Sequence, residues 1–255
     1  MLTDAVVGDL AAFGPFFAVQ THLPGSIPRE PWHAMNELVD DPDVLTHRVA
    51  TVRSRLAGAG GQAPDGVELR VAASVTHLGL VARLVSPVLA VAVTSGELLE
   101  IDDLASTRWQ RVVGGAFPLS VPRSVDADVS SHDATPEPAA RRLACLLASR
   151  VLDGPVRDLV EAAARLSVSR QVLWGNVAST INGAASMIAT RQPGWANRSR
   201  MIASLLLDQP PLRDTSVGST DGGFRRRSCC LIYRAAPTVA RAVCGDCVLS
   251  RDPSS

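Results

Sequence analysis

Residues 71–96, VAASVTHLGLVARLVSPVLAVAVTSG, form the longest apolar stretch of the chain. Its length would allow a helix that spans a membrane. Arg83 opposes a membrane helix, because arginine near the centre of such a helix costs about 2.5 to 3.5 kcal/mol. His77 opposes it as well, and Pro87 is expected to break the hydrogen-bond ladder. Because apolar residues cover nearly every face at helical spacing, we expect a buried helix at the centre of a soluble fold.

Helical patterns recur on both sides of this stretch. Residues 41–58 place their apolar side chains on one stripe and end at Gly58, which predicts an amphipathic surface helix. Around Gly154 the pattern predicts two successive helices separated by an Asp-Gly stop. Residues 169–190 predict a long helix, and residues 197–210 predict a shorter one.

The helical period is lost in two stretches. Residues 97–121 show short extended runs around Gly114 and Gly115, which predict one or two small hairpins. Residues 122–138 are rich in Ser, Asp and Pro, which predicts a surface loop. The predicted fold class is therefore α+β and predominantly α-helical, with a helical domain, a small antiparallel sheet and a C-terminal cysteine-bearing segment.

The chain of 255 residues is long enough to bury a substantial core without disulfides. We expect a mostly helical body over residues 1–221 and a segment over residues 222–255 that packs on the same domain. The 25 basic residues equal the 25 acidic ones, so no overall field attracts the protein to nucleic acid or to an anionic membrane.

The N-terminal sequence MLTDAVVGDLAAFGPFFAV is apolar, but it lacks the positively charged leading segment of a secretory signal. It also carries Asp4 and Asp9. We therefore expect a cytoplasmic protein. Thiols are kept reduced in that compartment, so grouped cysteines are expected to bind a metal rather than to form disulfides.

Four of the five cysteines lie in the arginine-rich stretch from residue 225 to residue 251. Cys229 and Cys230 are adjacent, and 13 residues separate them from the Cys-Gly-Asp-Cys turn formed by Cys244 and Cys247. Four thiolates complete either a tetrahedral zinc site or the terminal ligands of an iron-sulfur cluster. The residues alone leave both metals open, together with an oxidised pair of disulfides.

The spacing of these cysteines departs from the common metal motifs. Zinc modules separate the members of a ligand pair by two to four residues, and ferredoxins have other spacings. Adjacent side chains in an extended strand point to opposite faces. Cys229 and Cys230 can therefore serve one centre only if the chain bends beside them.

The stretch Arg-Arg-Ser-Cys-Cys-Leu-Ile-Tyr-Arg followed by Cys-Gly-Asp-Cys resembles the FhuF-like ferric siderophore reductases, whose C-terminal signature is Cys-Cys-x10-Cys-x2-Cys around a [2Fe-2S] cluster. ARLVSPVLAVAV at 82–93 and LWGNVASTINGA at 173–184 are similar to internal segments of the same family. The interval between the pairs is three residues longer here, which costs a few tenths of a kcal/mol in loop closure. We therefore expect cluster binding to be retained.

This resemblance implies that Cys229, Cys230, Cys244 and Cys247 hold a [2Fe-2S] cluster. It also implies that the protein is an iron-sulfur oxidoreductase, which passes one electron to siderophore-bound ferric iron and releases ferrous iron in iron acquisition. An external donor such as a ferredoxin would supply the electron. Association with an uptake transporter would be peripheral.

Residues 222–255 contain six Arg and two Asp, a local excess of positive charge in a neutral chain. Arg225, Arg226 and Arg227 are therefore candidates for docking an anionic ferric complex or an acidic donor. A solvated basic turn would account for the same residues.

Three further expectations follow from the residues. The alternative function is a non-redox metal-binding protein, with zinc or an iron-sulfur centre, that binds a siderophore or a partner without reduction. Cys145 lies on the apolar side of its predicted helix and is expected to be a small buried side chain. GAGGQA at 58–63 follows a helical pattern rather than a strand, so we expect a loop and no dinucleotide site.

Overall fold

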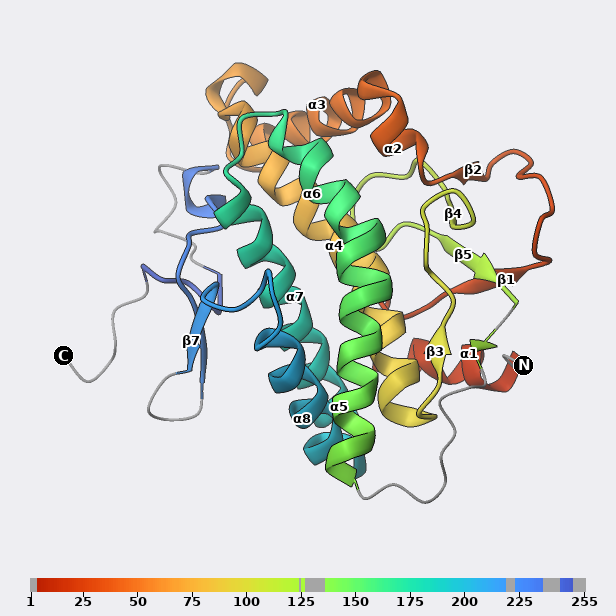
Figure 1. Ribbon diagram of the computed structural model, residues 1–255. Helices are drawn as coiled ribbons and strands as arrows, with labels where there is room; N and C mark the ends of the chain where they lie inside the picture. Colours follow the sequence, from red (N-terminus) through yellow and green to blue (C-terminus); the bar gives the residue numbers. More distant parts are fainter. Residues whose placement is uncertain (1–3, 124, 127–135, 219–222, 236–243, 250–255) are drawn as a thin grey trace.

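The computed structural model describes the chain except residues 1–3, 124, 127–135, 219–222, 236–243 and 250–255. Helices cross the centre of the molecule, and short strands lie at its two sides (Figure 1). The α-helices are α1 (Asp4–Leu10), α2 (Glu37–Asp40), α3 (Pro42–Ala59), α4 (Leu69–Thr94), α5 (Pro136–Leu147), α6 (Arg157–Ala164), α7 (Arg170–Arg191) and α8 (Ala196–Leu207). The predicted fold class, α+β and predominantly helical, is confirmed.

Helix α4 is the central element, as its sequence predicts. It packs against α7 and α3, and α8 lies against α7 and α5. By length and composition α4 could cross a membrane, but 78% of its apolar window is buried inside the protein. Pro87 lies inside the helix, so the predicted break is wrong. Packing on several sides of α4 offsets the roughly 3 kcal/mol that a proline costs inside a helix.

Arg83, the charge within this apolar helix, has three backbone partners. Its guanidinium donates to the carbonyl oxygens of Phe117 at 2.8 Å, Phe16 at 2.6 Å and Ala18 at 2.8 Å. The side chain is 2% exposed, and burial lowers its pKa to about 10, so it stays charged at neutral pH. Arg83 therefore joins α4 to the N-terminal segment and to the chain beside the sheet.

The main sheet has four short strands in the order β1-β5-β4-β2. The β4–β5 pair is antiparallel and encloses the Gly114-Gly115 turn, which confirms a predicted hairpin. β1 pairs with β5 in parallel, so the sheet is mixed. The strands are β1 (Gln20–His22), β2 (His33–Ala34), β3 (Leu98–Leu99), β4 (Arg108–Trp109), β5 (Leu119–Pro122), β6 (Val125–Asp126), β7 (Ser216–Gly218) and β8 (Phe224–Arg226).

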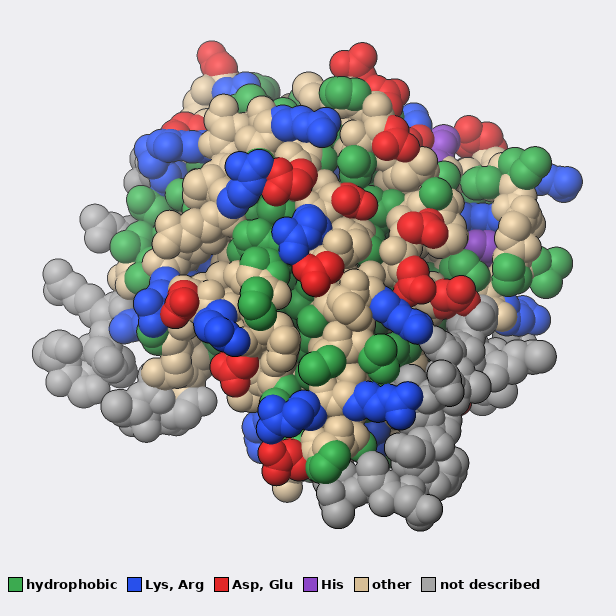
Figure 2. Space-filling model, viewed as in Figure 1, with side chains coloured by type: hydrophobic (Ala, Val, Ile, Leu, Met, Phe, Trp, Pro, Cys, Tyr) green, Lys and Arg blue, Asp and Glu red, His purple; other side chains and the backbone are tan. Residues whose placement is uncertain are grey.

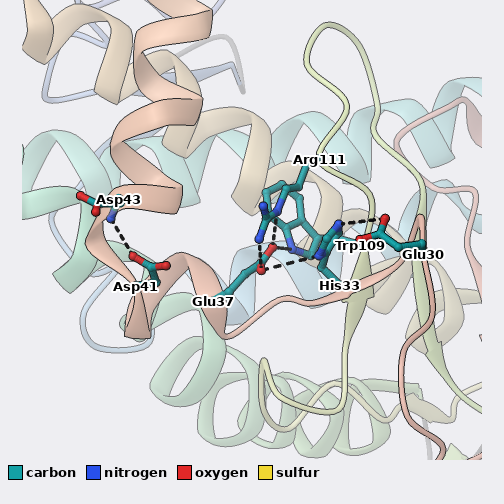
Figure 3. A network of polar contacts seen from close by, with 7 residues as sticks. All are labelled: Glu30, His33, Glu37, Asp41, Asp43, Trp109 and Arg111. Atoms are coloured by element: carbon teal, nitrogen blue, oxygen red, sulfur yellow. Dashed lines mark hydrogen bonds and ion pairs between the residues drawn. The ribbon is translucent and has the colours of Figure 1, made fainter.

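A polar network fixes the N-terminal segment to this sheet (Figure 3). Glu37 of α2 accepts hydrogen bonds from Trp109 Nε1 and Arg111 Nε, each at 2.9 Å. His33 lies 3.8 Å from Glu37 on one side and 3.8 Å from Glu30 on the other. Periodicity along the sequence does not reveal contacts between distant segments. For this reason β1 and β2 could not be assigned from the sequence.

Two other local expectations are corrected. Cys145 is exposed on α5 rather than buried, because its neighbours Leu143 and Ala144 face the core in its place. The predicted loop at 122–138 contains β6 and the start of α5, and much of the rest lies outside the described residues. The predicted break at Gly154 is confirmed by its non-helical φ of −105° and ψ of −113°.

The surface matches the balanced composition of the chain. In Figure 2, Arg side chains and Asp or Glu side chains alternate over the visible face, with apolar groups between them. The sheet around β1 and β5 lies on one side of the helices, and β7 with the described C-terminal segment lies on the other (Figure 1). The cysteine pairs are therefore supported by helices rather than by the main sheet.

Replacing Arg83 with methionine should lower the free energy of unfolding by about 3 kcal/mol, because three carbonyl groups lose their donor. Urea unfolding would measure the loss. Arg141→Met is the control, since Arg141 is exposed and forms an ion pair with Glu137 of the same helix, worth about 0.5 kcal/mol or less. Equal losses in the two variants would contradict this role of Arg83.

Candidate metal centre

The cysteine-bearing segment is docked on helices α4 and α7. Ser74 of α4 donates to the carbonyl oxygen of Cys230 at 2.9 Å. Ser228 donates to the carbonyl oxygen of Gln171, in the first turn of α7, at 3.1 Å. Hydrogen bonds from both helices therefore fix the backbone on each side of the Cys-Cys pair.

The chain bends next to Cys229-Cys230, as a shared centre requires. Leu231 has a φ of 70°, in the left-handed region that a non-glycine residue rarely adopts. Its amide donates to Cys229 Sγ at 3.3 Å, and a short 3-10 turn, Ile232–Arg234, follows. The left-handed residue interrupts the extended chain. The two adjacent cysteines therefore need not point to opposite faces, as they would in a straight strand.

The second cysteine pair lies on a tight turn. The amide of Cys247 donates to the carbonyl oxygen of Cys244 at 3.1 Å, and the amide of Leu249 donates to Cys247 Sγ at 3.3 Å. Each pair thus has one sulfur that accepts a bond from the amide two residues later. Amide donors stabilise thiolates and bound iron-sulfur groups and help to set their potential.

The two arms of the segment meet at a sulfur–sulfur contact. Cys230 Sγ and Cys244 Sγ lie 3.4 Å apart. Two sulfurs bound at about 2.3 Å to one tetrahedral metal are roughly 3.8 Å apart, so a small adjustment would let this pair share an ion. The backbone supports the approach, because the amide of Arg226 donates to the carbonyl oxygen of Asp246 at 3.1 Å.

The thiols of this contact are electrostatically coupled. The hydrogen bond with Cys244 lowers the pKa of Cys230 to about 6, and nearby amides and the Arg226 guanidinium act in the same direction. The same contact raises the pKa of Cys244, because losing the second proton would place two thiolates side by side. Burial raises the pKa of Cys229, whose nearest charges include Cys230, Cys247 and Arg226. Cys230 is therefore available as a thiolate at neutral pH.

Arg226 is the buried cation of this site. It is 1% exposed, and its Nη2 donates to Asn176 Oδ1 at 2.8 Å and to the carbonyl oxygen of Val172 at 3.1 Å. Asn176 in turn donates to the carbonyl and hydroxyl oxygens of Ser74 at 3.1 and 3.2 Å. These bonds form a chain from α7 through α4 to the carbonyl of Cys230.

His77 lies beside this chain and stays neutral. It is fully buried, and burial together with the Arg226 charge lowers its pKa to about 3. Its ring contacts Asn176 Nδ2 through Nδ1 at 3.5 Å. Burial also lowers the pKa of Arg226, while the nearby Cys230 and Cys244 act in the opposite direction, and the neutral His77 adds no second positive charge beside it.

Glycine is required where the segment crosses α7. A Cβ atom on Gly175 would lie 2.3 Å from Ser228 Oγ and 3.0 Å from Arg226 Nη2. The missing side chain therefore admits Ser228 and Arg226 against the helix. In the sequence, the Leu-Trp-Gly-Asn stretch is notable only for its family resemblance. In the structure its glycine leaves room for Ser228 and Arg226, and its asparagine accepts a hydrogen bond from Arg226.

A second anchor holds the chain beyond the bend. Ala235 packs into a small apolar group with Ala57, Val67 and Val71, and its carbonyl oxygen accepts from Gln62 Nε2 at 2.6 Å. The GAGGQA stretch ends α3 and forms a turn, which confirms the predicted loop. This loop therefore supports the segment after the Cys-Cys pair.

The three arginines proposed for docking occupy different positions. Arg226 is interior, so its guanidinium donates to Asn176 and to the carbonyl oxygen of Val172 rather than to a surface partner. Arg227 is exposed and Arg225 is half-buried. The docking role of this basic turn stays a prediction. The effect of the long interval between the cysteine pairs also stays a prediction, because residues 236–243 lie outside the described part of the chain.

The geometry described above agrees with a comparison against known families. Residues 226–249 match the FhuF 2Fe-2S C-terminal domain. The matched FhuF segment begins at the buried Arg226 and contains both cysteine pairs, which confirms the resemblance and the predicted [2Fe-2S] cofactor. No curated protein matches the chain.

The residues of the FhuF segment fit such a cluster. Four thiols are the expected donor set, and each iron of a [2Fe-2S] cluster takes two of them. Among the described residues, no group of three or more His, Cys, Asp or Glu side chains is placed to hold a single metal ion. Arg226 Nε is a buried donor without a partner among the described residues, as expected beside a group that accepts hydrogen bonds.

The Gly175→Ala variant should lower the free energy of unfolding by about 1 kcal/mol relative to Gly183→Ala. Its new methyl group displaces the Ser228 hydroxyl from the carbonyl of Gln171. Gly183 lies on the same helix and has open space at its Cβ position, so it controls for helix propensity. Urea unfolding of both variants measures the difference, and equal midpoints would refute the close approach.

Proposed function

We propose that this protein is a ferric siderophore reductase that transfers one electron from a [2Fe-2S] cluster to siderophore-bound ferric iron. The observation that carries the proposal is the contact between Cys230 and Cys244, one from each cysteine pair, beside the buried Arg226 and within the segment that matches the FhuF 2Fe-2S C-terminal domain. The alternative is a protein with a zinc or iron-sulfur centre that binds a siderophore or a partner without reduction, and the iron-release experiment below separates the two.

The substrate chemistry explains why one electron is enough. Oxygen donors such as hydroxamates bind the hard ferric ion far more strongly than the ferrous ion. Adding one electron to the chelated iron converts Fe(III) to Fe(II), weakens the oxygen–iron bonds and releases the metal. A bound [2Fe-2S] cluster supplies electrons singly.

The protein residues would hold that cluster and set its potential. Cys229, Cys230, Cys244 and Cys247 would be the ligands, and the amides of residues 231 and 249 donate to two of the sulfurs. The Arg226 charge favours the more negative, reduced form of the site. Cys229 and Cys244 are half-buried, so one edge of the site is accessible to a partner.

The charge of the basic turn and the chemistry of the thiols suggest the electron donor, the form of the chelate and the cellular location. We propose that the exposed Arg227 and the half-buried Arg225 attract an anionic chelate or an acidic donor such as a ferredoxin. Reduced thiol ligands and a soluble donor favour a cytoplasmic location, with peripheral association with an uptake transporter as the supply of chelate.

The deciding experiment combines colour with iron release. Anaerobically reconstituted wild-type protein should show broad visible absorption that bleaches with dithionite. It should also generate ferrous iron from a ferric trihydroxamate, as trapped by a chromogenic ferrous chelator with a reduced ferredoxin as donor. Cys247→Ser should lose both signals, whereas Cys145→Ser should keep both, because Cys145 is exposed on α5. A colourless, zinc-bearing wild type, or equal iron release by the two variants, would exclude the proposed reduction.

Arg226→Met should make the midpoint potential of the cluster more negative by on the order of 50 mV, because a buried positive charge is lost. Arg226→Lys should recover part of this shift. Arg227→Met, which removes an exposed charge from the adjacent residue, should change the potential far less. Potentiometric titration monitored by visible absorption gives all three values, and equal shifts for Arg226→Met and Arg227→Met would contradict this assignment.

A further inference from the structure

A large cavity opens beside the helices that support the FhuF segment. Its volume is about 660 Å³, within the range of small-molecule binding sites. It lies between α3, α4 and α7, and the chain at residues 13–17 and the turn at residues 113–115 complete its wall. The cavity therefore uses the N-terminal segment that shows no motif in the sequence.

The lining is predominantly apolar with a few polar groups. Val75, Leu78 and Ala82 of α4 contribute to the apolar wall. Arg48 and Arg55 of α3 are its charged members, and no carboxylate joins them among the described lining residues. Burial lowers the pKa of Arg48 to about 10, so it remains a cation at neutral pH. The cavity therefore suits a ligand with an apolar part and a negative or oxygen-rich part.

Thr180 gives a second sign of a ligand. Thr180 contributes to the lining of this cavity, and its buried hydroxyl has no hydrogen-bond partner among the described residues. A buried hydroxyl without a partner costs free energy that a bound oxygen or nitrogen atom would recover.

Two helical glycines create much of the space. Gly79 of α4 and Gly183 of α7 both line the cavity, and a Cβ added to either would meet no atom within 4 Å. Glycine inside a helix costs about 1 kcal/mol relative to alanine. Neither position requires glycine for close packing. The absence of a side chain at these two positions instead keeps the cavity open.

The cavity and the metal centre share their supporting residues. Ser179 lines the cavity, and its hydroxyl donates to Asp246 Oδ2 between Cys244 and Cys247. On α4, Val75 and Thr76 line the cavity directly after Ser74, which holds the carbonyl of Cys230. A ligand in the cavity would therefore be one side chain away from the FhuF segment.

We propose that this cavity binds ferric chelates carrying an apolar acyl or aryl substituent, with the substituent between α4 and α7 and the oxygen-rich part near the arginines and hydroxyls. This inference rests on the proposed reductase function and adds the substrate class. Apolar contacts supply affinity here, and Ser179 connects the cavity wall with the segment that carries the cysteines through its hydrogen bond to Asp246.

The test compares two trihydroxamate chelates that differ in carrying an octanoyl or an acetyl group, both loaded with Ga(III). Ga(III) replaces Fe(III) without being reduced, so binding is measured apart from electron transfer. Calorimetric titration of reconstituted full-length protein should show at least tenfold tighter binding of the octanoyl chelate, because several methylene groups leave water.

Filling the cavity should remove this preference. Gly183→Leu and Gly79→Leu should weaken the octanoyl chelate at least tenfold and leave the acetyl chelate within about twofold. Gly58→Leu is the matched control, since Gly58 is a helical glycine of α3 with an open Cβ position outside the cavity lining. Circular dichroism and the visible spectrum of the cluster would verify that each variant folds and is loaded.

The outcomes separate this inference from the reductase function. Equal affinities of the two chelates, or no effect of the cavity variants, would overturn the inference, while ferrous iron release from the acetyl chelate would still support reduction. Octanoate alone competing as strongly as the octanoyl chelate would identify a fatty-acid site and also overturn it. Octanoyl-selective binding that Gly183→Leu abolishes would support it, and a failure of that bound chelate to be reduced would count against the reductase function alone.

Discussion

The hydrogen-bond chain from Arg226 through Asn176 and Ser74 to the carbonyl of Cys230 is the constraint on which the site depends. It connects two long helices with a segment that has little regular structure of its own. A buried guanidinium is costly unless it has partners, and here they come from α7. The same interaction that fixes the segment also places a positive charge near the sulfurs of Cys229, Cys230 and Cys244.

Local backbone geometry also helps to bring the two cysteine pairs toward each other. The left-handed Leu231 and the turn from Cys244 to Cys247 direct sulfurs from two arms toward each other, and the contact between Arg226 and Asp246 holds the arms together. The sulfurs need not all converge on a single point, because a two-iron centre divides its ligands between two metals. This division explains how an adjacent Cys-Cys pair, unusual for zinc, can serve the site.

The cavity and the metal centre are two products of one helix pair. The α4–α7 contact supplies Ser74 and Asn176 to the segment, and Gly79, Ser179 and Gly183 to the cavity. On each helix, the residues that support the segment lie only a few positions from the residues that line the cavity. Because helices are rigid, the proposed ligand site and the proposed electron source keep a constant distance from each other. Arg83 of the same α4 holds the N-terminal chain that closes the far wall of the cavity.

Helices α3, α4, α7 and α8 could be predicted from the sequence, because helical periodicity is a local property of a chain. The four cysteines as cluster ligands came from the family resemblance, and that role stays a prediction. The exposure of Cys145, the continuity of α4 through Pro87 and the parallel pairing of β1 with β5 could not. Each depends on packing between segments distant in sequence, which overrides local preference. Only the tertiary structure distinguished the interior Arg226 from its exposed neighbour Arg227. Arg226 is buried because Asn176 and the carbonyl of Val172, both distant in sequence, accept hydrogen bonds from its guanidinium.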